Sequence, residues 1–206
     1  MPKPWMIYGA NGYTGELIAR EAARRGLGPV LAGRTATNVE QLAASLSLHS
    51  RVFDLGDAAA IARNVEGMTL VLHCAGPFSA TAAQMMAACL SAHAHYLDIT
   101  GEISVFEHTR TLDAAARAAG VVMCPGVGFD VIPTDCVAAA LKAALPDATH
   151  LALGSIRARA SRLERRRPRW KDSLRAARCA RMVVSSPCRS PIRPDASTSA
   201  MARNSP

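Results

Sequence analysis

The chain has 206 residues, enough for one α/β domain of about 150 residues with roughly 50 more, which favours one sizeable core over two. Its net charge of +8 would suggest an anionic partner if the charge were spread evenly. Of the 24 Lys and Arg and 16 Asp and Glu, however, 14 and 3 lie in residues 157–206, so residues 1–156 hold 10 basic and 13 acidic residues. The part of the chain with a globular composition is therefore mildly acidic.

The cysteines and the N-terminus indicate a cytoplasmic protein. The six cysteines form no CxxC pair, and Cys74, Cys89, Cys124 and Cys136 fall in apolar runs where a small buried thiol packs well, so we expect reduced core residues. Residues 1–9 hold too few apolar side chains for a signal peptide or a membrane span. We expect neither a targeting segment nor a membrane span.

Short apolar runs alternate with alanine-rich stretches of helical length, which is typical of βαβ units around a parallel sheet. The predicted strands are Trp5–Tyr8, Pro29–Ala32, Arg51–Leu55, Thr69–Cys74, His95–Ile99, Val121–Cys124 and Thr149–Gly154. The predicted helices lie near 13–25, 57–66, 80–92, 103–119 and 134–144, and another opens at the capping-box pattern of Thr37 and Glu40. The sequence predicts a Rossmann-type, doubly wound α/β domain with a mostly parallel sheet over residues 1–156.

Residues 157–206 have a different composition, rich in Arg, Ser, Pro and Ala, with few large apolar side chains to offset the entropy of ordering. We expect a disordered C-terminal tail. Its segment Arg162–Lys171 holds six basic residues, which is compatible with binding to nucleic acid. We do not favour that function, because Trp170 is the one aromatic residue of the segment.

The first predicted strand runs into Gly9-Ala-Asn-Gly12-Tyr-Thr-Gly15, in which three glycines are spaced three residues apart. Glycines so placed permit a tight turn, close approach of the backbone to phosphate and close packing of helix on strand. The following helix would direct its N-terminal N–H groups at a pyrophosphate. A plain strand-to-helix turn is the alternative. The expected cofactor contacts here are Gly9, Asn11, Gly12, Tyr13, Thr14 and Gly15.

The end of the second strand distinguishes NADP from NAD, because a basic residue there accommodates the 2′-phosphate whereas an acidic one binds the ribose hydroxyl. Arg34 occupies this place, with no Asp or Glu beside it. Arg34 would form a charge-assisted contact with the phosphate. We therefore expect NADP as cofactor in preference to NAD; an exposed loop arginine is the alternative.

Two further strand ends supply expected cofactor contacts. Asp54 ends the third strand and either reaches the adenine region or caps the helix near 57–66. Ala75, Gly76 and Pro77 follow the fourth strand, where small residues allow the backbone to pass beside the nicotinamide ribose. An ordinary loop with Ser79 as helix cap fits these residues equally well.

Hydride transfer needs a group that stabilises or protonates the substrate heteroatom, so polar residues at strand ends are the catalytic candidates. They are Asp98, Glu102, Asp130 and Asp135. Helix capping is the alternative role for Glu102 and Asp135.

Two other kinds of site are disfavoured. His93 and His95 form an HxH pattern, but alternate strand residues point to opposite faces and no third ligand converges, so we expect no metal. The short-chain dehydrogenases need a lysine four residues after the catalytic tyrosine, and none follows Tyr8, Tyr13 or Tyr96 at that spacing.

Five motifs in this order resemble the NADP-binding domain of the saccharopine dehydrogenase-like family, which includes bacterial trans-acting enoyl reductases that assist polyketide synthases. They are Gly9–Gly15, Ala32–Arg34, Ala75–Phe78, Tyr96–Glu102 and Pro125–Asp135, and the resemblance covers residues 5–156. It implies an NAD(P)-dependent oxidoreductase that moves a hydride at C4 of the nicotinamide. In such relatives a small-molecule, acyl or lipid-type substrate binds between this domain and a second α/β domain.

The resemblance also implies that the second domain is missing, since the Arg-rich tail stands in its place. Shifting the reading frame of back-translated residues 167–184 gives an ordinary helix and strand pattern, so our hypothesis is that the tail after about residue 160 is a frameshift product. The chain would then be truncated and inactive as an enzyme. A non-catalytic NADP-binding sensor or regulatory module is the alternative function.

Overall fold

The computed structural model describes residues 4–129 and 131–150. The chain divides into two compact units, residues 1–129 and 130–206, and the first holds the sheet and the candidate site. In the second unit the structure describes one helix, α7 (Ile132–Ala144). Asp130, most of the predicted strand Thr149–Gly154, the expected boundary at residue 156 and the expected tail lie outside the described residues.

The first unit is built on a six-stranded sheet in which every neighbouring pair of strands is parallel. The strand order is β3-β2-β1-β4-β5-β6. The strands are β1 (Trp5–Tyr8), β2 (Val30–Gly33), β3 (Ser50–Val52), β4 (Leu70–His73), β5 (His95–Asp98) and β6 (Met123–Cys124). This is the doubly wound order, so the predicted Rossmann-type fold is confirmed.

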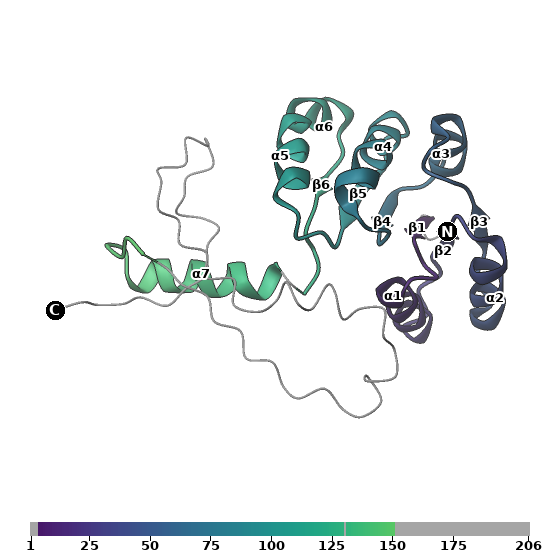
Figure 1. Cartoon of the computed structure of the whole chain (residues 1–206), viewed down its shortest axis with the longest axis horizontal. Coiled ribbons are helices and arrows are strands. Elements are labelled where there is room, and N and C mark those ends of the chain that lie inside the picture. Colours follow the sequence, from purple (N-terminus) through teal and green to yellow (C-terminus); the bar gives the residue numbers. More distant parts are fainter. Residues whose placement is uncertain (1–3, 130, 151–206) are drawn as a thin grey trace. The chain divides into compact units, whose positions relative to one another are not determined.

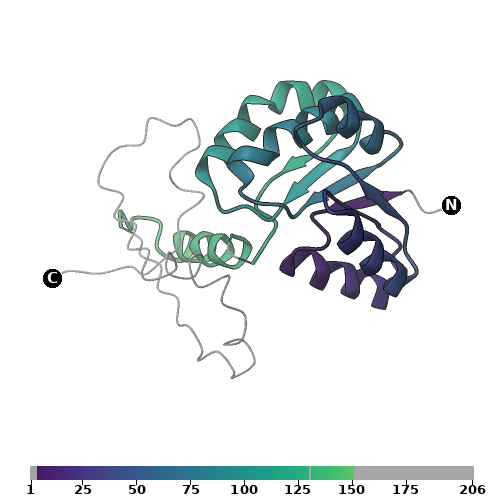
Figure 2. The same ribbon diagram turned by 45° about the vertical axis from the view of Figure 1, so that its right-hand side comes forward.

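Helices cover both faces of the sheet (Figures 1 and 2). They are α1 (Tyr13–Arg24), α2 (Ala36–Leu46), α3 (Ala58–Val65), α4 (Phe78–Ser91), α5 (Ile103–Thr111) and α6 (Asp113–Ala119). Because side chains alternate along β1, Ile7 joins the core beneath α1 and α2, whereas Met6 and Tyr8 join the larger core beneath α3 to α6. Both faces of the central strand are thus buried, which explains its continuous apolar sequence.

Several predicted element boundaries were wrong, and Cys124 and Cys136, expected in the core, are exposed. The helix expected near 103–119 is two helices that meet at Leu112, whose N–H bonds to the Thr109 carbonyl three residues back. Strand β3 ends at Val52, because Asp54 turns the chain by accepting a bond from the Gly56 N–H at 2.7 Å. Helix α2 begins at Ala36, so Thr37 lies inside its first turn and the predicted capping box does not form.

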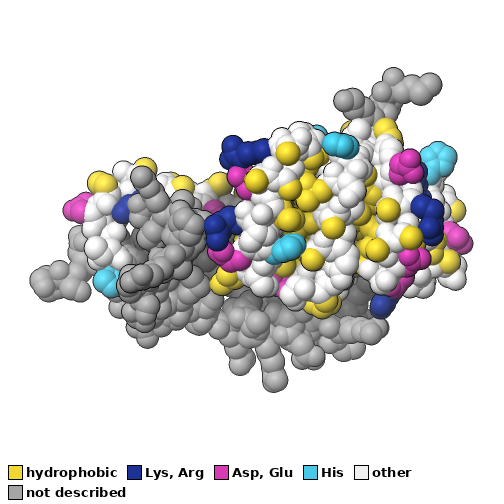
Figure 3. Space-filling view, turned by 90° about the horizontal axis from the view of Figure 1, so that it is seen from above, with side chains coloured by type: hydrophobic (Ala, Val, Ile, Leu, Met, Phe, Trp, Pro, Cys, Tyr) yellow, Lys and Arg dark blue, Asp and Glu magenta, His cyan; other side chains and the backbone are white. Residues whose placement is uncertain are grey.

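The helical face over α3 to α6 carries acidic and basic side chains next to one another, with apolar side chains between them (Figure 3). Its ion pairs join Glu107 to Arg110 at 3.2 Å and Asp113 to Arg117 at 2.9 Å within single helices, where each pair adds only tenths of a kcal/mol. Among the described residues, no helix has the length and apolar character needed to cross a membrane.

Candidate functional site

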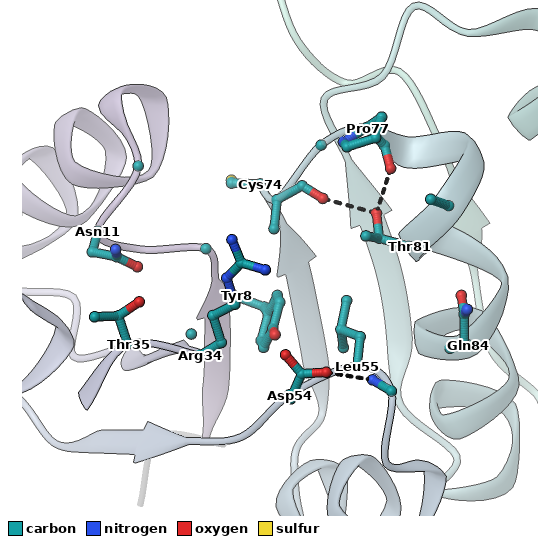
Figure 4. A pocket seen from close by; sticks show the side chains of 17 residues that line it. Tyr8, Asn11, Arg34, Thr35, Asp54, Leu55, Cys74, Pro77, Thr81 and Gln84 are labelled. Atoms are coloured by element: carbon teal, nitrogen blue, oxygen red, sulfur yellow. Dashed lines mark hydrogen bonds between the residues drawn. The ribbon is translucent and has the colours of Figure 1, made fainter.

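A cavity of about 650 Å³ opens where the carboxyl ends of β1, β2, β3 and β4 meet (Figure 4). Strands β1 and β4 are neighbours in space but not in sequence, and open α/β sheets bind ligands at such a switch point. The lining comprises Tyr8, Gly9, Asn11, Gly12, Gly33, Arg34, Thr35, Asp54, Leu55, Gly56, Cys74, Ala75, Gly76, Pro77, Ala80, Thr81 and Gln84. Eight of the eleven expected cofactor contacts belong to this lining, whereas Tyr13, Thr14 and Gly15 lie in the first turn of α1.

Two glycines allow the backbone to form the narrow part of this cavity. Gly9 has φ +80°, and a Cβ there would lie 2.9 Å from the backbone nitrogen of Ala75, so the turn after β1 and the loop after β4 approach closely. A Cβ on Gly15 would overlap the carbonyl oxygen of Gly9. The residues present therefore fit the turn, backbone approach and helix packing that a dinucleotide-binding turn requires.

Helix α1 directs its positive end toward the cavity wall. Its N-cap is Gly12, which lines the cavity, and within residues 4–129 no side chain caps this end. The first N–H groups of a helix have no intrahelical acceptor, and together with the helix dipole they favour an anion. This end of the cavity is suited to a phosphate group.

Arg34, Thr35 and Asp54 form the side of the cavity next to β2 and β3 (Figure 4). The alternative role of Asp54 as cap of α3 is excluded, because the N-cap is Asp57, which accepts a bond from the Ala60 N–H at 3.0 Å. Asp54 instead holds the Gly56 N–H and lines the cavity.

Tyr8 lies between these charged residues and the core. Its hydroxyl donates to the Phe53 carbonyl at 3.1 Å. Burial raises the pKa of Tyr8 to about 12, the negative charge of Asp54 adds to the rise, and Arg34 opposes it. Tyr8 therefore stays protonated at physiological pH and acts as a structural donor.

The opposite side of the cavity consists of the loop after β4 and the first turns of α4. Ala75, Gly76 and Pro77, three of the expected cofactor contacts, line it. Helix α4 begins at Phe78 with Pro77 as N-cap, so the alternative in which Ser79 caps the helix is wrong. Thr81 stabilises the loop, since its hydroxyl lies 2.8 Å from the Ala75 carbonyl and 3.0 Å from that of Pro77.

His73 is a feature of this side that the sequence did not reveal. It is fully buried at the end of β4, stacks on Tyr8 with ring centroids 5.5 Å apart, and lies 3.0 Å through Nε2 from the Thr81 hydroxyl. Burial lowers the pKa of His73 to about 4, with the backbone of Ala75 opposing. Nδ1 has no hydrogen-bonding partner in the described part of the chain. The available signal was one histidine within an otherwise apolar strand.

The carboxylate of Asp98, a catalytic candidate, is fully buried. It accepts bonds from the Tyr96 hydroxyl at 2.8 Å, the Thr100 N–H at 3.0 Å and the Gly126 N–H at 2.8 Å. Burial, followed by the charge of Asp98, raises the pKa of Tyr96. In this structure Asp98 holds loops together, and a role in proton transfer stays a prediction.

The other candidates have different surroundings. The carboxylate of Glu102 accepts bonds from the N–H groups of Phe78 at 2.7 Å and Ser79 at 2.8 Å, so it caps α4 and not its own helix. Asp135 lies in the first turn of α7, in the second unit, and desolvation raises its pKa. Their catalytic roles, like that of Asp130, stay predictions.

The two histidines of the HxH pattern make separate backbone contacts. His93 Nδ1 lies 3.0 Å from the Ala119 carbonyl, and His95 Nδ1 accepts a bond from the Val122 N–H at 3.0 Å. Across residues 4–129 and 131–150, no group of three His, Cys, Asp or Glu side chains is placed to hold a metal ion.

Comparison with known proteins identifies the domain. Residues 5–124 match the family model of the saccharopine dehydrogenase NADP binding domain. A saccharopine dehydrogenase-like oxidoreductase of Rattus norvegicus is 28% identical over 155 residues, covering 65% of this chain and 36% of that protein. A putative trans-acting enoyl reductase of Mycobacterium tuberculosis is 28% identical over 138 residues, covering 63% of this chain and 33% of that protein. The chain thus spans about a third of the length of these relatives.

A solved structure supports the same fold. Apo saccharopine dehydrogenase (L-Glu forming) from Saccharomyces cerevisiae superposes with a TM-score of 0.57 at 17% identity, covering 68% of this chain and 30% of the yeast chain. Since the family model covers more than half of the chain and describes the domain that carries the cavity, the chain belongs to the family of the saccharopine dehydrogenase NADP binding domain.

Proposed function

We propose that the cavity binds NADP(H) in preference to NAD(H), and that the chain provides the cofactor-binding part of a hydride-transferring oxidoreductase. The observation that carries the cofactor preference is the place of Arg34, which lines the cavity directly after β2. The stretch Gly33–Thr35 holds no acidic residue that would bind a ribose 2′-hydroxyl. A guanidinium at this place favours the 2′-phosphate of NADP.

The lining residues also suggest where the other parts of the cofactor would bind. The pyrophosphate would lie at Gly12 and the N-terminus of α1, and the adenosine would extend toward Arg34 and Asp54. The nicotinamide riboside would extend toward the loop Cys74–Pro77. Bound there, the cofactor supplies a hydride at C4 of its nicotinamide ring.

The family supports a reaction of the oxidoreductase class. Among the relatives, the name trans-acting enoyl reductase points to an acyl-type substrate, and we extend that substrate class, or a comparable small molecule, to this chain. Asp98, Glu102, Asp130 and Asp135 stay our candidates for the group that stabilises or protonates the substrate.

Binding of NADPH and NADH to the whole chain, measured by isothermal titration calorimetry, tests the cofactor preference. Arg34→Ala is expected to weaken NADPH binding roughly 10- to 100-fold through loss of a charge-assisted bond, and to leave NADH binding unchanged. Arg117→Ala is the matched control, because Arg117 is a surface arginine on α6 that pairs with Asp113. Equal affinity for both cofactors in wild type and Arg34→Ala would overturn the preference.

A further inference from the structure

The N-terminus of α4 is capped by a carboxylate from another loop. Glu102, which follows β5, reaches Phe78 and Ser79 across more than 20 residues of sequence, and each of its two oxygens accepts one backbone N–H. Hydrogen bonds from the Ser79 side chain, and from the backbones of Phe78 and Ser79, lower the pKa of Glu102 against the effect of desolvation. Glu102 is therefore anionic at neutral pH and is fixed at the start of α4.

The same loop is tied to its neighbours through a continuous set of hydrogen bonds. The Glu102 N–H donates to the Thr100 hydroxyl at 3.0 Å, and the Thr100 N–H donates to Asp98 at 3.0 Å. Asp98 also accepts the Gly126 N–H, and its carbonyl accepts the Val127 N–H at 2.8 Å. Hydrogen bonds thus connect the loops after β5 and β6, and Glu102 connects both to the start of α4, where the loop after β4 ends.

Three helices have their N-cap residue on the cavity lining, Gly12 for α1, Thr35 for α2 and Pro77 for α4, and the N-termini of α1 and α4 differ in charge. At α1, no side chain of residues 4–129 caps the helix, whereas the first N–H groups of α4 are bound to Glu102. A phosphate would therefore be attracted to α1 and not to α4, where an anionic carboxylate already occupies the donors. The start of α4 instead forms one wall of the cavity, which the Glu102 cap holds in place.

This wall faces the half of the cavity away from Arg34. Pro77 and Thr81 lie on the opposite side of the cavity from Arg34 and Asn11 (Figure 4). If the 2′-phosphate binds at Arg34 and the pyrophosphate at α1, the nicotinamide riboside lies against the loop that ends at Pro77. Glu102 itself does not belong to the described lining, so it acts through the loop that it caps.

We propose that Glu102 is a positioning residue for the nicotinamide half of the cofactor: it fixes the loop Cys74–Pro77 and keeps the pyrophosphate away from the N-terminus of α4. This inference rests on the proposed function, because it needs the cofactor to lie in the cavity in that direction. It differs from a general structural role in one respect. Loss of the cap weakens binding of the nicotinamide end of the cofactor and leaves binding of the adenosine end unchanged.

The test compares NADPH with 2′-phospho-ADP-ribose, which has the same adenosine and pyrophosphate but lacks the nicotinamide ring. Affinities are measured for the whole chain as wild type, Glu102→Ala and Glu102→Gln. We expect Glu102→Ala to weaken NADPH about tenfold and to leave 2′-phospho-ADP-ribose unchanged within about twofold. Glu102→Gln retains one amide oxygen as acceptor, so its affinity for NADPH should fall less than that of Glu102→Ala.

Glu107→Gln is the matched control, since Glu107 lies on the adjoining helix α5 and pairs with Arg110 at the surface. The positioning role is overturned if NADPH affinity is unchanged in both Glu102 variants, or if the affinities for NADPH and 2′-phospho-ADP-ribose fall equally. If Glu102→Ala does not fold, Glu102→Gln alone decides by the same comparison of the two ligands. A wild-type chain that binds neither ligand overturns the proposed function, and this inference with it.

Discussion

The stability of the protein is expected to fall as the pH is lowered from 7 to 4, and His73 is the residue to which the loss is assigned. Its pKa is 6.5 in a solvated chain and about 4 in the folded state, because burial disfavours the imidazolium. Between these two values the unfolded chain takes up a proton that the folded chain excludes. Stability therefore rises with pH across this window.

The size of the effect follows from the two pKa values. Each tenfold difference in proton affinity corresponds to about 1.4 kcal/mol, so the complete loss is roughly 3 kcal/mol, of which about 2 kcal/mol is reached by pH 5. This is a large part of the 5–15 kcal/mol by which a domain is usually stable.

Urea unfolding followed by circular dichroism at pH 7.5 and pH 5 measures the effect, with His73→Gln as the test variant. Gln does not titrate in this range, and its amide can donate to the Thr81 hydroxyl or accept from it in place of His73 Nε2. The pH-dependent loss should be about 2 kcal/mol smaller in His73→Gln than in wild type, and His108→Gln, at an exposed histidine, should behave as wild type. An identical pH dependence in wild type and His73→Gln would refute the assignment.

Two further predictions concern stability. Gly15→Ala should lower the melting temperature by several degrees and abolish cofactor binding, because its Cβ would overlap the Gly9 carbonyl, whereas Gly28→Ala, with open space around its Cβ position, should change neither in calorimetry. A wild-type melting temperature in Gly15→Ala would contradict the packing argument. Asp57→Ala removes the cap of α3 and should cost about 1 kcal/mol in chemical denaturation, and Asp57→Asn, which keeps an acceptor for the Ala60 N–H, should cost clearly less. Equal losses in the two variants would show that the cap bond is not the cause.

The sequence predicted the fold well, because the strands around the central position carry their own signal. Burial on both sides makes β1 a continuous apolar run and β4 apolar up to His73, and the glycine turn marks the first βα unit. Local patterns also singled out Arg34 and Asp54, which both line the cavity. These features depend on residues close together in the chain.

Features that depend on contacts between distant segments were missed. Sequence periodicity does not indicate that Glu102 caps a helix formed by Phe78–Ser91, since the partners belong to separate βα units. It likewise placed Asp98 at a strand end without revealing that the N–H of Gly126, from the loop after β6, donates to its buried carboxylate. A carboxylate at a strand end looks catalytic by position, and only tertiary structure shows which donors it holds.

The close approach of Gly9 to Ala75 has a consequence for how such a site can diversify. Because Gly9 has no side chain and its backbone closely approaches Cys74 and Ala75, the backbone of the two loops sets the width of the cavity there. Side chains on either flank, such as Arg34 and Gln84, can then change without altering the span between them. The flank of the cavity at Arg34 can then acquire a different preference for a phosphate or a hydroxyl group. The flank at Gln84 keeps its distance from the loop after β1.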